Sequence, residues 1–121
     1  MEDLIKKIKR LEFQMKLVGE SISSEDSPIA SLVISLNWGE AELEKAHDIF
    51  EKYNNELDGG KEPNWRAFEA DFKDDLGIDY QQLKLVVLSF YRNFQWTEVC
   101  MQYALKYNCV EFHSITQNLN R

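Results

Sequence analysis

Six apolar residues near the start of the chain follow one another at alternating steps of four and three residues. They are Leu4, Ile8, Leu11, Met15, Val18 and Ile22. A helix places such positions on one face, and about three heptads of this pattern are typical of a coiled-coil seam. The spacing therefore predicts a long N-terminal helix over residues 1–24 whose six seam residues form an oligomer interface.

The residues beside this seam bear on how many helices associate. With Ile8 at an a position and Leu11 at a d position, Lys7 and Glu12 fall at the flanking g and e positions. Ile at a with Leu at d favours two strands, whereas Met at a weakens that preference. Packing inside its own domain is an alternative for this helix, because about 20 residues at ~1.5 Å each span only the diameter of such a domain.

Turn-forming residues are scarce, with five Gly and two Pro in 121 residues. A sandwich or barrel of many short strands needs turn chemistry at each corner, so this scarcity argues against one. The length is that of a single domain with its own core. We therefore expect one all-α domain over residues 1–121, a multihelical bundle of about six helices with its helical core at residues 27–108.

Local signals divide this core into helices. Helix starts are expected at Ser27-Pro28, Glu40, Glu62-Pro63-Asn64, Asp79 with Gln82 as its capping partner, and Thr97. Helix ends are expected near Asn37-Trp38-Gly39, at Asp58-Gly59-Gly60 and at Gly77. Gly39 and Gly77 are the residues expected to adopt the left-handed conformation that ends a helix.

The expected inner faces are rich in aromatic side chains. They include Phe50, Trp65, Phe68, Phe90 and Phe94. Leu85–Leu88 contains a β-branched pair, so a strand is an alternative there, but the helical spacing continues on both sides and favours a helix. Periodicity fades after Asn108, and residues 110–121 are expected to form a polar C-terminal tail.

The net charge of −7 is unevenly distributed along the chain. Residues 1–19 carry +2, residues 20–79 carry −11 and residues 80–121 carry +2. This acidity argues against direct binding of nucleic acid. It instead offers an alternative function, an acidic inhibitor or decoy of a nucleic-acid-binding protein that presents Glu40, Glu44 and Asp48.

Several segments share apolar spacing and residue types with a known family. They are Ile8 to Phe13, Ser27 to Leu36 with the break at Trp38-Gly39, the helix through Leu57, Leu76 to Tyr91, and Trp96 to Val99. Over residues 5–105 the chain resembles the YhaI-like proteins, small helical proteins of Gram-positive bacteria that are grouped as a domain of unknown function. Members usually have Gly between the last two helices, where this chain has Asn93-Phe94-Gln95. The resemblance implies an all-helical, self-associating domain and brings no activity, cofactor or catalytic residue.

Metal and thiol chemistry have few candidate residues. Glu44 and His47 have the Glu-x-x-His spacing of di-iron bundles, but such a site needs a second copy of that motif and further glutamates. Cys109 and His113 lie four residues apart and Cys100 is nearby, yet no Cys-x-x-Cys pair occurs. A solvated or paired histidine and buried thiols are the simpler interpretation. We expect no enzyme activity, no metal and no cofactor, with a small metal or thiol enzyme as the remaining alternative.

Some aromatic residues fall outside the predicted seams. Phe13, Tyr80, Tyr91, Trp96 and Phe112 are therefore candidates for a partner surface, although packing at helix corners is an equal alternative. The apolar runs reach four residues, far short of the roughly 20 that span a bilayer. Two cysteines without a stapled scaffold indicate a reducing cytoplasm. We expect a cytoplasmic, non-enzymatic homo-oligomer that binds another protein and has an interaction or regulatory role.

Overall fold

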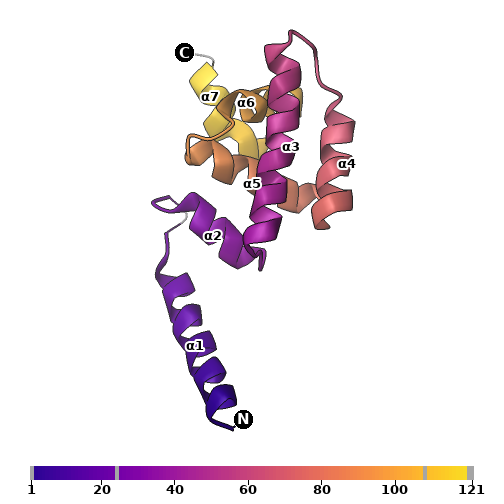
Figure 1. The fold of residues 1–121 in the computed structure, drawn as a ribbon. Coiled ribbons are helices and arrows are strands. Elements are labelled where there is room, and N and C mark those ends of the chain that lie inside the picture. Colours follow the sequence, from indigo (N-terminus) through magenta and orange to yellow (C-terminus); the bar gives the residue numbers. More distant parts are fainter. Residues whose placement is uncertain (1, 24, 108, 120–121) are drawn as a thin grey trace.

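The computed structural model describes residues 2–23, 25–107 and 109–119, and within these residues it is all-helical (Figure 1). The helices are α1 (Glu2–Ser21), α2 (Pro28–Ser35), α3 (Glu40–Asp58), α4 (Trp65–Leu76), α5 (Tyr80–Arg92), α6 (Thr97–Lys106) and α7 (His113–Leu119), with a 3-10 turn η1 (Val110–Phe112) before α7. The described residues thus form seven α-helices instead of about six. The additional helix is α7, which lies in the segment expected to be a polar tail.

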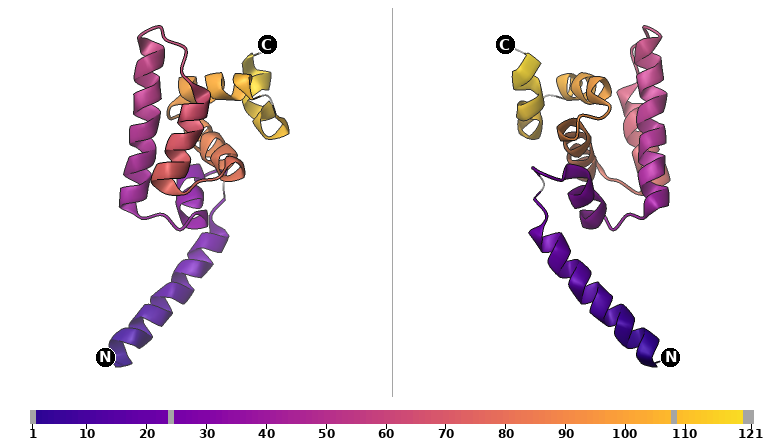
Figure 2. Two further views of the ribbon diagram at one scale, coloured as in Figure 1. Left: turned by 90° about the vertical axis from the view of Figure 1, so that its right-hand side faces the viewer. Right: turned by 60° about the vertical axis from the view of Figure 1, so that its left-hand side comes forward.

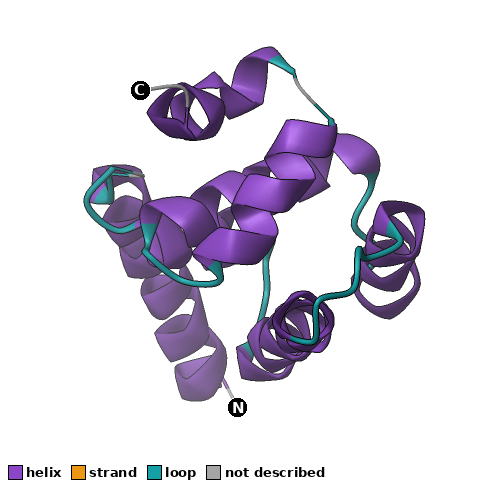
Figure 3. Ribbon diagram, turned by 90° about the horizontal axis from the view of Figure 1, so that it is seen from above, coloured by secondary structure: helices purple, strands orange, loops and turns teal. Residues whose placement is uncertain are grey.

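Helices α2 to α7 pack together as a body, and α1 extends away from it (Figures 1 and 2). Within the body, α3 packs on α4, α2 on α5, and α6 on α3, α5 and α7. Seen from above, the body consists of helices and their connecting loops (Figure 3). The fold therefore has two parts, a packed body and one projecting helix.

Aromatic side chains dominate the core of the body. Fully buried examples are Phe50, Phe68, Phe72, Phe90, Tyr103 and Phe112. Phe50 lies at their centre, with ring centroids 4.7 Å from Phe90 and 5.5 Å from Phe72. Each such buried side chain stabilises the fold by roughly 1.5–3 kcal/mol relative to leaving it exposed. All of these residues belong to α3 to α6 or to η1, so the core is assembled without α1.

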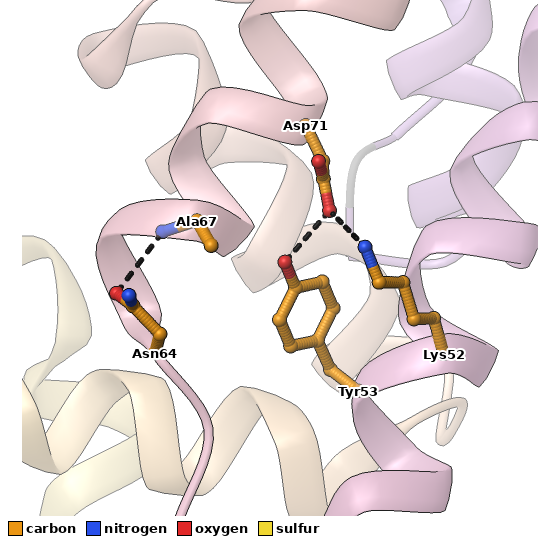
Figure 4. Close-up of polar contacts among 5 residues, drawn as sticks. All are labelled: Lys52, Tyr53, Asn64, Ala67 and Asp71. Atoms are coloured by element: carbon orange, nitrogen blue, oxygen red, sulfur yellow. Dashed lines mark hydrogen bonds and ion pairs between the residues drawn. The ribbon is translucent and has the colours of Figure 1, made fainter.

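Side-chain caps determine where α4 and α5 begin. The Asn64 side chain accepts hydrogen bonds from the backbone N–H groups of Arg66 and Ala67, at 3.1 and 3.2 Å. Figure 4 shows the bond from Ala67. Asp79 and Gln82 form the expected capping box, in which each side chain accepts from the backbone N–H of the other residue, at 2.7 and 3.0 Å. These contacts satisfy N–H groups that a helix leaves unpaired at its start. The capping box predicted at Asp79 is confirmed, and Asn64, in the segment predicted to open the fourth helix, is the N-cap of α4.

The predicted helix ends near Asn37-Trp38-Gly39 and at Gly77 are confirmed, but the left-handed residue expected at Gly39 is found elsewhere. Gly77 has a φ of +65° after α4 and ends that helix in the left-handed conformation. After α2 it is Asn37, with a φ of +55°, that adopts this conformation, whereas Gly39 has a φ of −97° and precedes α3. Asn tolerates the left-handed region better than most residues because its short polar side chain bonds locally.

The C-terminal segment differs from the expected polar tail. Its described part forms η1 and α7, and Phe112 and Ile115 are fully buried. The ring centroid of Phe112 lies 5.8 Å from that of Tyr103. One turn of 3-10 helix and two turns of α-helix are too short to give a periodic apolar pattern, so the sequence reading missed them. Residues 120 and 121 of the expected tail lie outside the described residues.

Candidate functional site

The apolar face of α1 is exposed along its whole length. Eight of its large apolar side chains are between 45% and 61% exposed, and no residue of α1 is buried. They are Leu4, Ile5, Ile8, Leu11, Phe13, Met15, Leu17 and Val18. Ile22, the last residue of the predicted seam, follows the helix and is half-buried. Exposed apolar surface of this extent makes α1 a candidate interaction site.

Only the C-terminal end of α1 comes close to the body. A Cβ atom on Gly19 would lie 3.3 Å from Cγ2 of Ile34 on α2, so the two helices approach closely at this glycine. From there α1 leads away from the body in both views of Figure 2. The alternative in which α1 packs inside its own domain is therefore not the arrangement of the described chain. Among the described residues, no helix combines the length and apolar character needed to cross a membrane.

Two of these eight apolar residues, Phe13 and Leu17, lie on the opposite side of α1 from the seam. Successive residues of a helix are about 100° apart, which places Phe13 and Leu17 next to each other and away from Leu11 and Met15. Their helix neighbours include Lys9 and other basic residues. Phe13, predicted as part of a partner surface, is thus exposed on the outer face of α1.

The other predicted partner-surface aromatics lie at separate places on the body. Tyr80 is exposed at the start of α5, where the Lys84 ammonium lies 4.7 Å from its ring centroid. Tyr91 is half-buried near the end of the same helix. Trp96 is half-buried as well, and Phe112 is part of the core. The sequence placed these residues in one group, and the structure places them at different corners.

His47 is engaged in the core of the body. The Trp96 indole donates its Nε1–H to Nδ1 of His47 at 3.0 Å, and the His47 ring packs edge-on against Phe90 at 5.2 Å. Because Nδ1 is occupied as an acceptor, it is not free to bind a metal. Throughout the described ranges, no three His, Cys, Asp or Glu residues are grouped so that they could hold a metal ion.

The two cysteines are poorly placed for nucleophilic chemistry. Cys100 is completely buried, and burial raises the pKa of its thiol. The pKa of Cys109 is also raised, first by its partial burial and then by a hydrogen bond to the Glu111 carboxylate. Since the thiolate is the reactive form, both environments disfavour it at neutral pH.

The acidic residues singled out in the sequence lie along the exposed side of α3. Glu40, Glu44 and Asp48 are all exposed. Lys45 and Lys52 stand among them and line the same hollow as Asp48. The Lys52 ammonium lies 3.1 Å from Asp71 on α4, which also accepts a 2.6 Å hydrogen bond from the Tyr53 hydroxyl (Figure 4). This surface is therefore of mixed charge near its centre.

Comparison with protein families shows which family the chain belongs to. The model of the family described as "Protein of unknown function (DUF1878)" matches residues 1–103. The chain belongs to this family. No curated protein and no solved structure gives a significant match. The DUF1878 match includes all of α1 and ends within α6, so the projecting helix is part of the family's common region and η1 and α7 lie beyond it.

In this DUF1878 protein, the exposure of Phe94 does not follow from the sequence pattern. The prediction that Phe94 lies on the inner face of the fifth helix is wrong, since α5 ends at Arg92 and Phe94 is 89% exposed. Phe94 and Trp96 both have left-handed backbone conformations, with φ of +60° and +52°. Thr97 does not cap α6 as expected but is its first residue, after Trp96. Polar residues on either side of Phe94, Asn93 and Gln95, are the sequence signal for a helix end at this point.

Proposed function

We propose that this protein self-associates through α1, and that two copies of α1 form a parallel coiled coil along Leu4, Ile8, Leu11, Met15, Val18 and Ile22. The observation that supports this proposal is the row of exposed apolar side chains on a helix with no buried residue. Removing apolar surface from water is the main driving force of such association. A second copy of α1 offers a matching seam of the same length.

Charge pairing favours the parallel orientation. In a parallel pair, the g residue of one helix faces the e residue five positions later on the other helix. Lys7 at g and Glu12 at e have this separation, so each dimer gains two pairs of opposite charge. An antiparallel pair brings g opposite g and e opposite e, and these contacts are lost.

We further propose a non-enzymatic, cytoplasmic role in which the dimer binds another protein. The buried Cys100 thiol and the engaged His47 side chain support a structural use of these residues. The resemblance to the YhaI-like proteins supports the self-association of this domain and is neutral on its activity. The acidic-decoy alternative is not proposed, because Lys45 and Lys52 lie among the carboxylates of α3 and α4.

Two leucine substitutions on the same helix test self-association. Leu11→Glu places a charge in the seam, whereas Leu17→Glu makes the same change on the outer face of α1, and both side chains are about half exposed. We expect the wild type and Leu17→Glu to be dimers and Leu11→Glu to be a monomer, because burying an unpaired carboxylate is strongly unfavourable. The measurement is molar mass by size-exclusion chromatography with light scattering.

Circular dichroism of the same samples checks that the body stays folded in each variant. Deletion of residues 1–21 is a further control, since the core contains no residue of α1. A monomeric wild type would reject the proposal. Dissociation by Leu17→Glu but not by Leu11→Glu would instead assign the interface to the outer face.

A further inference from the structure

Phe94 is an exposed aromatic residue at a backbone position that usually holds glycine. Its N–H donates to the Tyr91 carbonyl and the next N–H, of Gln95, donates to the Phe90 carbonyl, both at 3.0 Å. This is the helix ending in which glycine is the usual residue, because a side chain is strained at positive φ. Phe94 instead combines that strain with an aromatic ring that is 89% exposed. Trp96 is equally strained, but its indole is held by His47.

A groove lies directly beside the Phe94 ring. It has a volume of about 510 Å³ and is lined by Glu25, Tyr91, Arg92, Phe94, Thr97 and Met101. Tyr91 and Met101 supply apolar walls, and the volume falls in the range of cavities that bind organic groups. A projecting aromatic ring and a groove that fits such a ring thus occupy one surface.

The groove is lined by one acidic and one basic residue, Glu25 and Arg92. Glu25 and Arg92 are both exposed, and within the described ranges neither side chain forms an ion pair. In an interface with two-fold symmetry, a contact between two different residues of the surface is made twice, once in each direction. Such an interface allows an Arg92–Glu25 pair between copies. Arg92 of one copy then faces Glu25 of the second copy, and the reverse contact forms at the same time.

The groove includes a residue from the connection that follows α1. Glu25 belongs to the connection between α1 and α2, and the α5–α6 connection lies on the same side of the body (Figure 1). A parallel coiled coil of α1 places both bodies at its C-terminal end. The grooves at the base of the two α1 helices are then close to one another, whereas an antiparallel coil would separate them by the length of α1.

We propose that Phe94 of each copy inserts into the groove of the second copy, so that the dimer is closed by a two-fold contact between bodies at the α5–α6 corner. This proposal rests on the proposed self-association through α1. It assigns the strained aromatic residue a role that is realised only in the dimer. Arg92 and Glu25 orient the contact, and Tyr91 and Met101 receive the ring.

Replacing Phe94 separates its role in the dimer from its role in folding. Phe94→Asn removes the ring and retains a residue that tolerates positive φ. We expect the dimer dissociation constant, measured by sedimentation velocity on the full chain, to rise at least tenfold. The thermal midpoint measured at concentrations where the chain is monomeric should stay constant or increase. Leu105→Ala, an exposed position on α6 outside the groove, is the matched control and should leave the dissociation constant unchanged.

Charge exchange tests the orientation of the contact. Arg92→Glu should weaken the dimer several-fold, and adding Glu25→Arg to the same chain should restore it. The inference is overturned if the wild type and Phe94→Asn dimerise equally and the double variant restores nothing, and in that case self-association through α1 still stands. A wild type that is monomeric at all concentrations removes both proposals.

Discussion

Two tyrosine hydroxyls join neighbouring helices to α4 at the edge of the aromatic core. Tyr53 of α3 donates to the Asp71 carboxylate at 2.6 Å, and Tyr103 of α6 donates to the Glu69 carboxylate at 2.9 Å. The rings of both residues are buried, so each hydroxyl needs a partner. The pKa of each hydroxyl is raised, first by burial and then by the hydrogen bond to the carboxylate.

These shifts predict a loss of stability at alkaline pH. A raised folded-state pKa means that the stabilising contribution is complete below the unfolded-state pKa of about 10 and is lost as the pH rises through the folded-state value. We expect the free energy of unfolding to fall between about pH 9 and about pH 11, and to fall less in a Tyr53→Phe, Tyr103→Phe double variant. Urea unfolding followed by circular dichroism measures it.

The exposed Tyr80 provides the control for this titration. Tyr80→Phe should follow the wild type across the whole pH range, because its ring lies outside the core. An equal alkaline loss in the wild type and the double variant would assign the effect to other groups. The comparison uses the change with pH, since removing either hydroxyl also weakens the protein at neutral pH.

The sequence predicts which residues are buried better than it predicts which residues have a left-handed backbone. Phe50, Phe68 and Phe90 lie on helical faces, and their burial follows from spacing. Phe94 continues that spacing by one step, yet α5 has already ended and the residue points to solvent. Left-handed conformations at Asn37, Phe94 and Trp96 depend on how the following helix docks, which local sequence does not determine.

The periodic pattern of α1 predicts that a helix forms, but it does not determine what the apolar seam packs against. The chain forms a helix over Glu2–Ser21, and its apolar side chains are exposed both on the predicted seam and outside it. The same spacing is satisfied by a partner helix and by packing within the domain, so the use of the seam stays a prediction. Helices α4 and α5 begin where the sequence predicts because their caps are contacts between residues two or three apart.

The orientation of the coiled coil is tested by exchanging Lys7 and Glu12. Lys7→Glu places like charges opposite each other in both pairs of a parallel dimer. Exposed pairs contribute roughly 0.2–1 kcal/mol each, so we expect the loss of both pairs to raise the dissociation constant about 2- to 30-fold. The Lys7→Glu, Glu12→Lys double variant should regain wild-type affinity in sedimentation experiments at low salt.

The matched control for this exchange is Lys9→Glu, a change of the same type at a b position away from the seam. It should alter the dissociation constant far less than Lys7→Glu. If the double variant is no tighter than Lys7→Glu alone, Lys7 and Glu12 are not opposite each other, and the helices run antiparallel.

For the molecule as a whole, the C-terminal segment closes the body opposite the projecting helix. Phe112 packs on Tyr103, and Glu111 lies 3.6 Å from the Lys84 ammonium of α5. Glu111 has a lowered pKa, first because of a backbone hydrogen bond and also because of Cys109 and Lys84. The segment lies beyond residues 1–103 of the family match and still contributes Phe112 and Ile115 to the core. Its tertiary contacts, not its short pattern, determine that it folds.

This packing predicts that substitutions at the two apolar positions of η1 change the free energy of unfolding by very different amounts. Phe112 is fully buried and Val110 is 77% exposed. Phe112→Ala should reduce the free energy of unfolding by about 3–5 kcal/mol, because it leaves a cavity against Tyr103. Val110→Ala removes surface that is already in water and should change it by less than about 0.5 kcal/mol. Urea unfolding of both variants measures the difference, and equal effects would mean that residues 110–119 behave as the polar tail first expected from the sequence.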